Sequence, residues 1–207
     1  MRRLFRVVAA ATLLSCSVPG ALVGVDEATI VTIDTRLPFT ADLPLSAIEA
    51  QSAELSYAVT VPVPVDVIAA LRARGREDDA KLIEENRGKL LAVELVAVEY
   101  EVPAPNLMPV DLKDARLFVT PIDHFRLDAA AREVGRIKPI LAGQAVPSTE
   151  LIYASTGKAD AALQIQSLMF TLLLDASFVV PRAVAIPAKA IRARLRLHVR
   201  ARIDLAG

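Results

Sequence analysis

The stretch IRARLRLHVRARI at residues 191–203 decides the fold of this chain. Its odd-numbered positions are all apolar and its even-numbered positions are all basic, so the side chains alternate between two faces. A period of two over this length is typical of a half-buried β-strand and excludes a helix. The stretch therefore predicts a long strand with one face in the core and a row of basic side chains on the other.

The same alternation recurs along the chain and predicts further strands. They are expected at 29–40, 55–65, 90–102, 112–120 and 168–180, with one short strand in the connection 129–144. Because 168–180 is apolar on one face and half apolar on the other, we expect it to be central in its sheet and to pair with 191–203. Pro62 and Pro64 cannot donate to a ladder, so the 55–65 strand is expected at a sheet edge.

Helical signals are few and concentrate between residues 66 and 88. Asp66 suits the N-cap of a helix over 67–72, Gly75 interrupts it, and a charged helix over 77–87 ends near Gly88. We interpret this insert as a crossover that covers one open end of the strands, and a docking element for a partner is the alternative. One or two helical turns are also predicted at 159–166, and a turn of uncertain helical character near 47–50.

Six or seven strands, proline-rich corners and one helical insert favour a mainly β fold, an immunoglobulin-like antiparallel β-sandwich. The Cys-Trp-Cys signature of antibody domains is missing, so only the architecture is predicted. We expect a single domain over 28–207 with the insert around 66–88.

Composition limits the function. The chain has 24 basic and 24 acidic residues, 54% hydrophobic residues and no tryptophan. Hydrophobic content at this length is enough for a substantial core. Nucleic-acid binding is not expected, because it needs a basic domain with clustered charge.

The first sixteen residues indicate export. Arg2, Arg3 and Arg6 form a basic region, and residues 7–15 form an apolar run of nine. Nine helical residues rise about 14 Å, well short of a bilayer core of about 30 Å. The run ends in Leu13-Leu14-Ser15-Cys16, with the only cysteine of the chain.

These four residues resemble the lipobox of bacterial lipoproteins. The resemblance implies that residues 1–15 are a signal peptide, that Cys16 becomes lipidated, and that 16–27 is a tether to the membrane. With no Asp after Cys16, sorting by analogy favours the outer membrane, facing the periplasm. The alternative is an ordinary signal peptide cut after Ser17 or Gly20, which gives a soluble secreted or periplasmic protein. The overall layout is also similar to uncharacterised envelope lipoproteins that carry immunoglobulin-like sandwiches.

Catalytic motifs are scarce. The sequence has no G-x-S-x-G, no glycine-rich phosphate loop and only two histidines, His124 and His198. Asp123-His124 is the one place where a general base could be built, and a simple loop histidine is the favoured interpretation. No calcium-loop or zinc-ligand spacing is present, so we expect no metal, no cofactor and no enzyme activity.

The unusual surface is the arginine row, which we define as Arg192, Arg194, Arg196, Arg200 and Arg202. Side chains two positions apart on a strand are spaced about 6.6 Å, so these charges repel unless something intervenes. We favour cross-strand pairing with carboxylates such as Glu99, Glu101 or Asp175. The alternative is an anionic partner: phospholipid headgroups, lipopolysaccharide or an acidic protein patch.

Three functions follow from these features. The first is a non-enzymatic, membrane-anchored envelope lipoprotein that acts as an interaction or structural module, with envelope proteins or anionic lipids as partners. The second is a carrier of a lipid or other hydrophobic ligand, which requires an internal cavity of several hundred Å³. The third is a small enzyme at Asp123-His124, which requires a pocket there and a carboxylate touching the imidazole.

Overall fold

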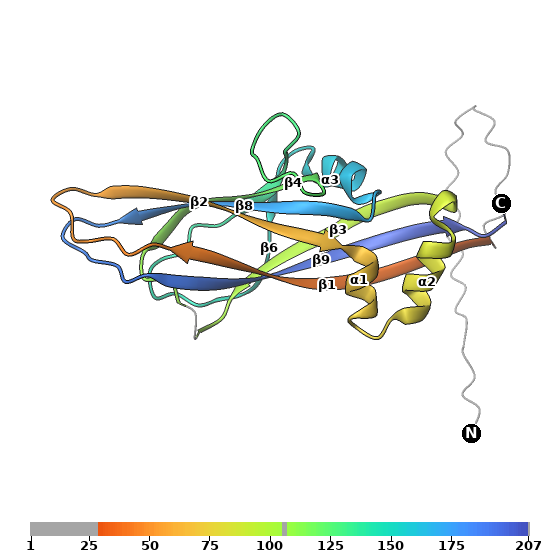
Figure 1. Cartoon of the computed structure of the whole chain (residues 1–207), viewed down its shortest axis with the longest axis horizontal. Coiled ribbons are helices and arrows are strands. Elements are labelled where there is room, and N and C mark those ends of the chain that lie inside the picture. Colours follow the sequence, from red (N-terminus) through yellow and green to blue (C-terminus); the bar gives the residue numbers. More distant parts are fainter. Residues whose placement is uncertain (1–28, 105–106, 207) are drawn as a thin grey trace, which may run out of the picture.

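The computed structural model describes residues 29–104 and 107–206, which form two antiparallel sheets packed face to face (Figure 1). The four-stranded sheet has the order β1-β9-β3-β6, and the five-stranded sheet has the order β2-β8-β4-β5-β7. The strands are β1 (Ile30–Leu45), β2 (Leu55–Asp66), β3 (Leu90–Val102), β4 (Asp111–Pro121), β5 (Arg132–Ile137), β6 (Val146–Glu150), β7 (Ile152–Tyr153), β8 (Met169–Val180) and β9 (Lys189–Asp204). This confirms the predicted mainly β sandwich, and its immunoglobulin-like assignment stays a prediction.

One long ribbon, folded over at a corner, makes one side of both sheets. β1 pairs with β9 along its whole length, and β2 pairs with β8 along its whole length. At the corner, Ile48 forms a β-bridge with Ile186, which continues the pairing register of β1 and β9. The pairing of β2 with β8 differs from this register by a shift of one residue, so the two strand pairs are nearly continuous. The β1–β2 and β8–β9 connections run side by side at the left of Figure 1.

This ribbon shows that the predicted pairing of 168–180 with 191–203 is wrong. β8 and β9 lie in different sheets, because each takes one half of the 30–66 segment as its partner. Their apolar faces meet across the core instead of lying on one sheet face. The central position predicted for 168–180 is confirmed, since β8 lies between β2 and β4.

The core lies between the inner faces of the two sheets. Leu195 and Ile191 of β9 are fully buried, as are Phe170 and Phe178 of β8. Full burial of such a side chain contributes about 1.5–3 kcal/mol, so these two strands supply a large part of the driving force for folding. Leu173 of β8 is also fully buried, although it points to the opposite face, where Pro62 and Phe118 lie beside it.

The helical insert follows β2 as predicted and contains α1 (Val67–Arg72), α2 (Glu77–Glu85) and the 3-10 turn η2 (Arg87–Lys89). Asp66 caps α1 by accepting a hydrogen bond from the Ala69 N–H at 2.9 Å. The insert joins strands of different sheets, and its buried apolar residues are part of the core. These residues are Val67, Ile68, Leu71, Ala80 and Ile83.

The free edges of β1 and β2 are protected against pairing with another chain. Alternate residues of an edge strand direct their backbone groups away from the neighbouring strand, and prolines are tolerated only there. β2 is an edge strand, as Pro62 and Pro64 predicted. On β1 the insert covers the edge: Arg76 donates to the Asp34 carbonyl at 3.0 Å and Arg74 donates to the Arg36 carbonyl.

The opposite side of the sandwich is closed by a strand that changes sheets. Residues 146–153 begin as β6 beside β3 and continue as β7 beside β5, with Leu151 at the change. Leu151 N–H donates to the Val98 carbonyl at 3.0 Å, and Ala154 N–H donates to the Val134 carbonyl at 3.1 Å. Helix α3 (Gly157–Ile165) follows and packs against β3 and β5. The sequence predicted β5 and the helical turns of α3, but not β6 or β7.

Candidate functional site

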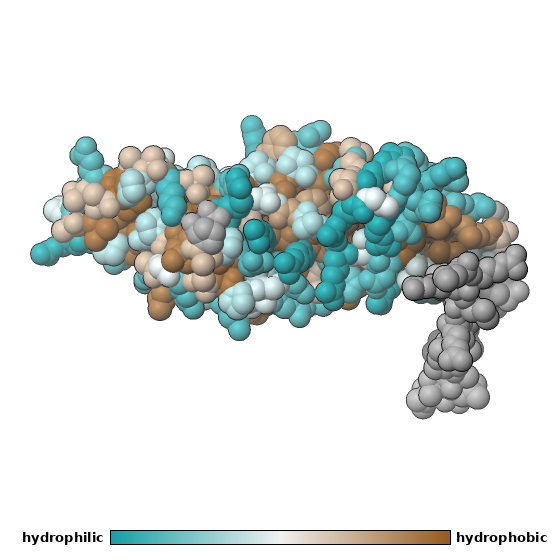
Figure 2. Space-filling model, turned by 90° about the horizontal axis from the view of Figure 1, so that it is seen from below, coloured by the Kyte–Doolittle hydropathy of each residue, from teal (hydrophilic) through white to brown (hydrophobic). Residues whose placement is uncertain are grey.

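The arginine row lies on the outer face of the four-stranded sheet, where β9 runs between β1 and β3. Figure 2 looks at the molecule from below, the side on which β1 and β9 lie in Figure 1, and shows hydrophilic residues that are densest to the right of the middle, towards α1 and α2. Acidic residues of both neighbouring strands flank the row. These residues are Asp34 and Asp42 on β1, and Glu94, Glu99 and Glu101 on β3.

Glu101 is the least exposed of these carboxylates. Its two oxygens accept from Arg194 Nη1 and Arg196 Nη2, each at 3.2 Å, and its side chain is only 21% exposed. Arg196 also lies 3.7 Å from Glu99. The sequence predicted pairing with both Glu99 and Glu101, and the structure confirms it.

The remaining arginines pair with carboxylates that the sequence analysis did not single out. Arg192 Nε lies 2.9 Å from Asp42, while Arg200 lies 3.1 Å from Asp34 and 3.8 Å from Glu94. The alternation of β1 already placed Asp34 on its polar face, but the sequence did not show that β1 lies next to β9. Such exposed pairs each contribute at most about 1 kcal/mol.

Asp34 is the centre of a small network. Its carboxylate accepts from His198 Nε2 and from Arg200, and its backbone carbonyl accepts from Arg76. The hydrogen bond from His198 is the main cause that lowers the pKa of Asp34; desolvation opposes it, and Arg200 lowers the pKa further. The carboxylate therefore stays ionised and binds the row to β1.

Two of the predicted arrangements differ from what is observed. Asp175 does not face the row, because β8 belongs to the other sheet; it lies 3.6 Å from Arg116 and accepts from Thr60 at 3.0 Å. Arg202 lies between Thr32 and Ala92, and the described residues give it no ion pair. The row is thus largely neutralised within the sheet, with Arg202 as its exception in that part of the chain.

The loop after β4 contains His124. Its Nε2 lies 3.0 Å from Asp128 Oδ1, and this carboxylate also accepts from the Ala130 N–H at 2.9 Å. The hydrogen bond from Ala130 is the main cause that lowers the pKa of Asp128. Thr120 Oγ1 donates to the His124 carbonyl at 2.7 Å. Among the described residues no hydroxyl or thiol side chain forms a hydrogen bond with the imidazole, whose bond to Asp128 links the two ends of residues 124–128.

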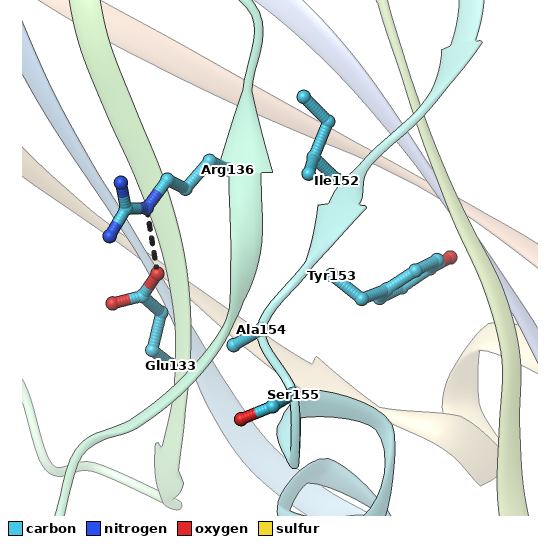
Figure 3. Close-up of a pocket in the computed structure, with 6 residues that line it drawn as sticks. All are labelled: Glu133, Arg136, Ile152, Tyr153, Ala154 and Ser155. Atoms are coloured by element: carbon cyan, nitrogen blue, oxygen red, sulfur yellow. Dashed lines mark hydrogen bonds and ion pairs between the residues drawn. The ribbon is translucent and has the colours of Figure 1, made fainter.

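A surface depression of about 410 Å³ lies at β5 and β7. Figure 3 shows Arg136 and Glu133 paired on one side, whereas Tyr153 points the other way, from the neighbouring strand. The Arg136–Glu133 distance is 3.2 Å, and Arg136 is mostly exposed. The depression therefore presents an ion pair at the surface rather than a set of convergent catalytic groups.

Tyr153 has a structural role in this region. Its hydroxyl oxygen accepts from the Val98 N–H at 2.7 Å, and Lys158 Nζ lies 4.2 Å from its ring centroid. Lys158 also donates to the Val96 carbonyl at 2.6 Å. Burial raises the pKa of Tyr153 to about 12, so the phenol stays protonated at neutral pH.

Between the sheets the structure shows an apolar cavity of about 10 Å³. This volume is close to the least that holds a single water molecule. Its lining is hydrophobic and includes Leu43, Met108 and Leu174. Nothing of this size accommodates a lipid, which requires several hundred Å³.

In the described part of the chain, no three histidine, cysteine or acidic residues lie close enough together to hold a metal ion. The helices within residues 29–104 and 107–206 are too short or too polar to cross a membrane. Cys16 and the rest of the predicted leader and tether lie outside the described residues. No protein-family model matches the chain, and a search of curated proteins finds no relative.

Proposed function

We propose that this chain is a non-enzymatic envelope lipoprotein, anchored to a membrane through Cys16, whose sandwich is an interaction or structural module. The observation that carries the proposal is the order of features along the sequence. A basic, apolar and cysteine-terminated leader is followed by a short tether and then by the sandwich, whose first strand begins at Ile30. The outer membrane, facing the periplasm, is the location that we propose.

The packing of the sandwich supports a module rather than a carrier. A hydrophobic ligand needs internal space, and the cavity between the sheets offers about 10 Å³. The row of charges on the outer face is mostly paired within its own sheet, which favours a stable outer surface over a site for anions. The predicted Asp123-His124 site holds an imidazole in contact with the carboxylate of Asp128, but the described residues place no hydrogen-bonded nucleophile beside it.

Mass spectrometry of the protein extracted from its native membrane tests the anchor. The mature chain is expected to begin at Cys16, with a diacylglycerol on its thiol and an acyl group on its amino terminus. The Cys16→Ser variant is the matched control, and it should leave the membrane fraction. A mature chain that begins at residue 18 or 21, or a bare Cys16 thiol, would overturn the anchor and leave a soluble secreted or periplasmic protein.

Crosslinking in the native membrane tests the module. Proteins and lipids captured by the wild-type chain are compared with those captured by a chain in which Arg202 is changed to serine. Arg202 is chosen because its loss breaks no ion pair of the described sheet. Unchanged partners would show that Arg202 takes no part in binding them, and lost partners would identify an anionic ligand of the row.

A further inference from the structure

The loop between β4 and β5 holds two apolar side chains out into solvent. Phe125 is 51% exposed and Leu127 is 42% exposed, with the exposed Arg126 between them. Figure 1 shows this green loop standing out from the sheets beside α3. Neither apolar side chain belongs to the core, so folding of the sandwich does not explain them.

The loop is fixed at its base. Thr120 donates to the His124 carbonyl at 2.7 Å, His124 contacts Asp128 at 3.0 Å, and the Ala130 N–H donates to the same carboxylate at 2.9 Å. These contacts leave residues 125–127 at the tip and define the turn that carries them. A tip fixed in this way loses little conformational entropy when it binds something.

The chemistry of the tip fits a lipid surface better than a protein. Apolar side chains such as Phe125 and Leu127 insert at the boundary between lipid headgroups and acyl chains, and the guanidinium of Arg126 can pair with the lipid phosphates. Asp123 and Asp128 are the acidic neighbours, and Asp128 is occupied by His124 and Ala130. A stable protein interface buries about 800 Å² on each side, whereas two apolar side chains separated by a charge offer much less.

We propose that Phe125, Arg126 and Leu127 form a second, peripheral contact with an anionic membrane, which orients the sandwich on the bilayer that holds its anchor. The proposal rests on the membrane location given under the proposed function. Two side chains bind weakly by themselves, but a tethered domain meets the surface at high effective concentration. Residues 17–28, if fully extended, span up to about 40 Å, enough for different faces of the domain to reach the bilayer.

The chain itself offers a clean experiment, because it has no tryptophan and only one cysteine. The full chain is produced without lipid, and Cys16 is coupled to a maleimide lipid in vesicles of phosphatidylcholine with phosphatidylglycerol. Phe125→Trp then reports on the tip, and Leu141→Trp reports on an exposed site in a different loop, where Leu141 is 62% exposed. Residues 1–15 are common to both variants, so any contact they make affects the two signals equally.

The expected result is that the emission of the Phe125→Trp variant moves to shorter wavelength and is quenched by brominated acyl chains, while that of Leu141→Trp keeps its solvent value. Adding Arg126→Gln should reduce the shift on anionic vesicles. Unchanged emission of Phe125→Trp, or equal shifts at both positions, would overturn the contact. Because coupling through Cys16 is chemical, that failure says nothing against natural lipidation, which mass spectrometry decides separately.

Discussion

Replacing Glu101 by glutamine tests whether the arginine row is held together by its own sheet. The substitution keeps the shape of the side chain and removes its charge. Glu101 accepts from Arg194 and Arg196 at 3.2 Å each, and Arg194 has no other carboxylate partner among the described residues. Exposed pairs contribute about 0.2–1 kcal/mol each, and the carboxylate is 21% exposed. We therefore expect a loss of about 1–2 kcal/mol in the free energy of unfolding.

Urea unfolding followed by circular dichroism measures this loss. Asp42→Asn is the matched control, because Asp42 makes one pair, with Arg192, and both side chains are more than half exposed. We expect it to cost about 0.5 kcal/mol or less at low salt and to become undetectable in 0.5 M NaCl, where the screening length is about 4 Å. A cost for Glu101→Gln within about 0.3 kcal/mol of zero, or below that of Asp42→Asn, would refute the reasoning.

Three further predictions follow from the same contacts. The pKa of Asp34 is lowered in the folded state, so the contribution of its carboxylate to the free energy of unfolding is present above about pH 4 and is lost as the pH falls through the folded pKa. In urea titrations the stability difference between wild type and Asp34→Asn should therefore shrink between pH 6 and pH 2. A constant difference would contradict this. Leu173→Ala should lower the free energy of unfolding by about 3 kcal/mol, because the side chain is fully buried although it points away from the main core. The control Leu141→Ala should change this free energy by less than about 0.5 kcal/mol. Equal unfolding midpoints for the two variants would exclude a buried Leu173. Gly157→Ala should lower the free energy of unfolding by about 2–3 kcal/mol, since the new Cβ would lie 2.1 Å from the Val134 carbonyl oxygen. The control Gly88→Ala, whose Cβ would have nothing within 4 Å, should be neutral or slightly stabilising. Melting temperatures of the two variants compare them directly.

The positions of the long strands could be predicted from the sequence, because each has one apolar face and the period of two reveals it. The predicted bounds 90–102 agree with β3. Within β3, however, a bulge lies between Leu95 and Ala97. It moves the buried face from Val93 and Leu95 to Val98 and Tyr100, so Val96, predicted to share a face with Val98, does not.

The parts that could not be predicted depend on contacts between distant segments. β6 and β7 lack an alternating pattern because their strand changes sheets at Leu151, so no single face stays buried. The exposure of Phe125 and Leu127 could not be predicted either, since apolar residues next to a strand end are equally typical of a buried loop. Contacts of Thr120 with His124 and of His124 with Asp128 fix the base of the loop. Thr120 Oγ1 also lies 3.3 Å from the Thr171 carbonyl, a contact that forms only when β4 and β8 are paired.

The incorrect pairing of β8 with β9 could have been avoided by comparing charges on the polar faces. Five arginines on one strand need acidic neighbours, because like charges on adjacent strands repel. The polar face of β8 offers Asp175 as its one carboxylate, so a β8–β9 pair would leave most of the row unpaired. β1 supplies Asp34 and Asp42, and β3 supplies Glu94, Glu99 and Glu101. The distribution of acidic residues thus favours β1 and β3 as the neighbours of β9, and with them the separation of β8 and β9 into two sheets.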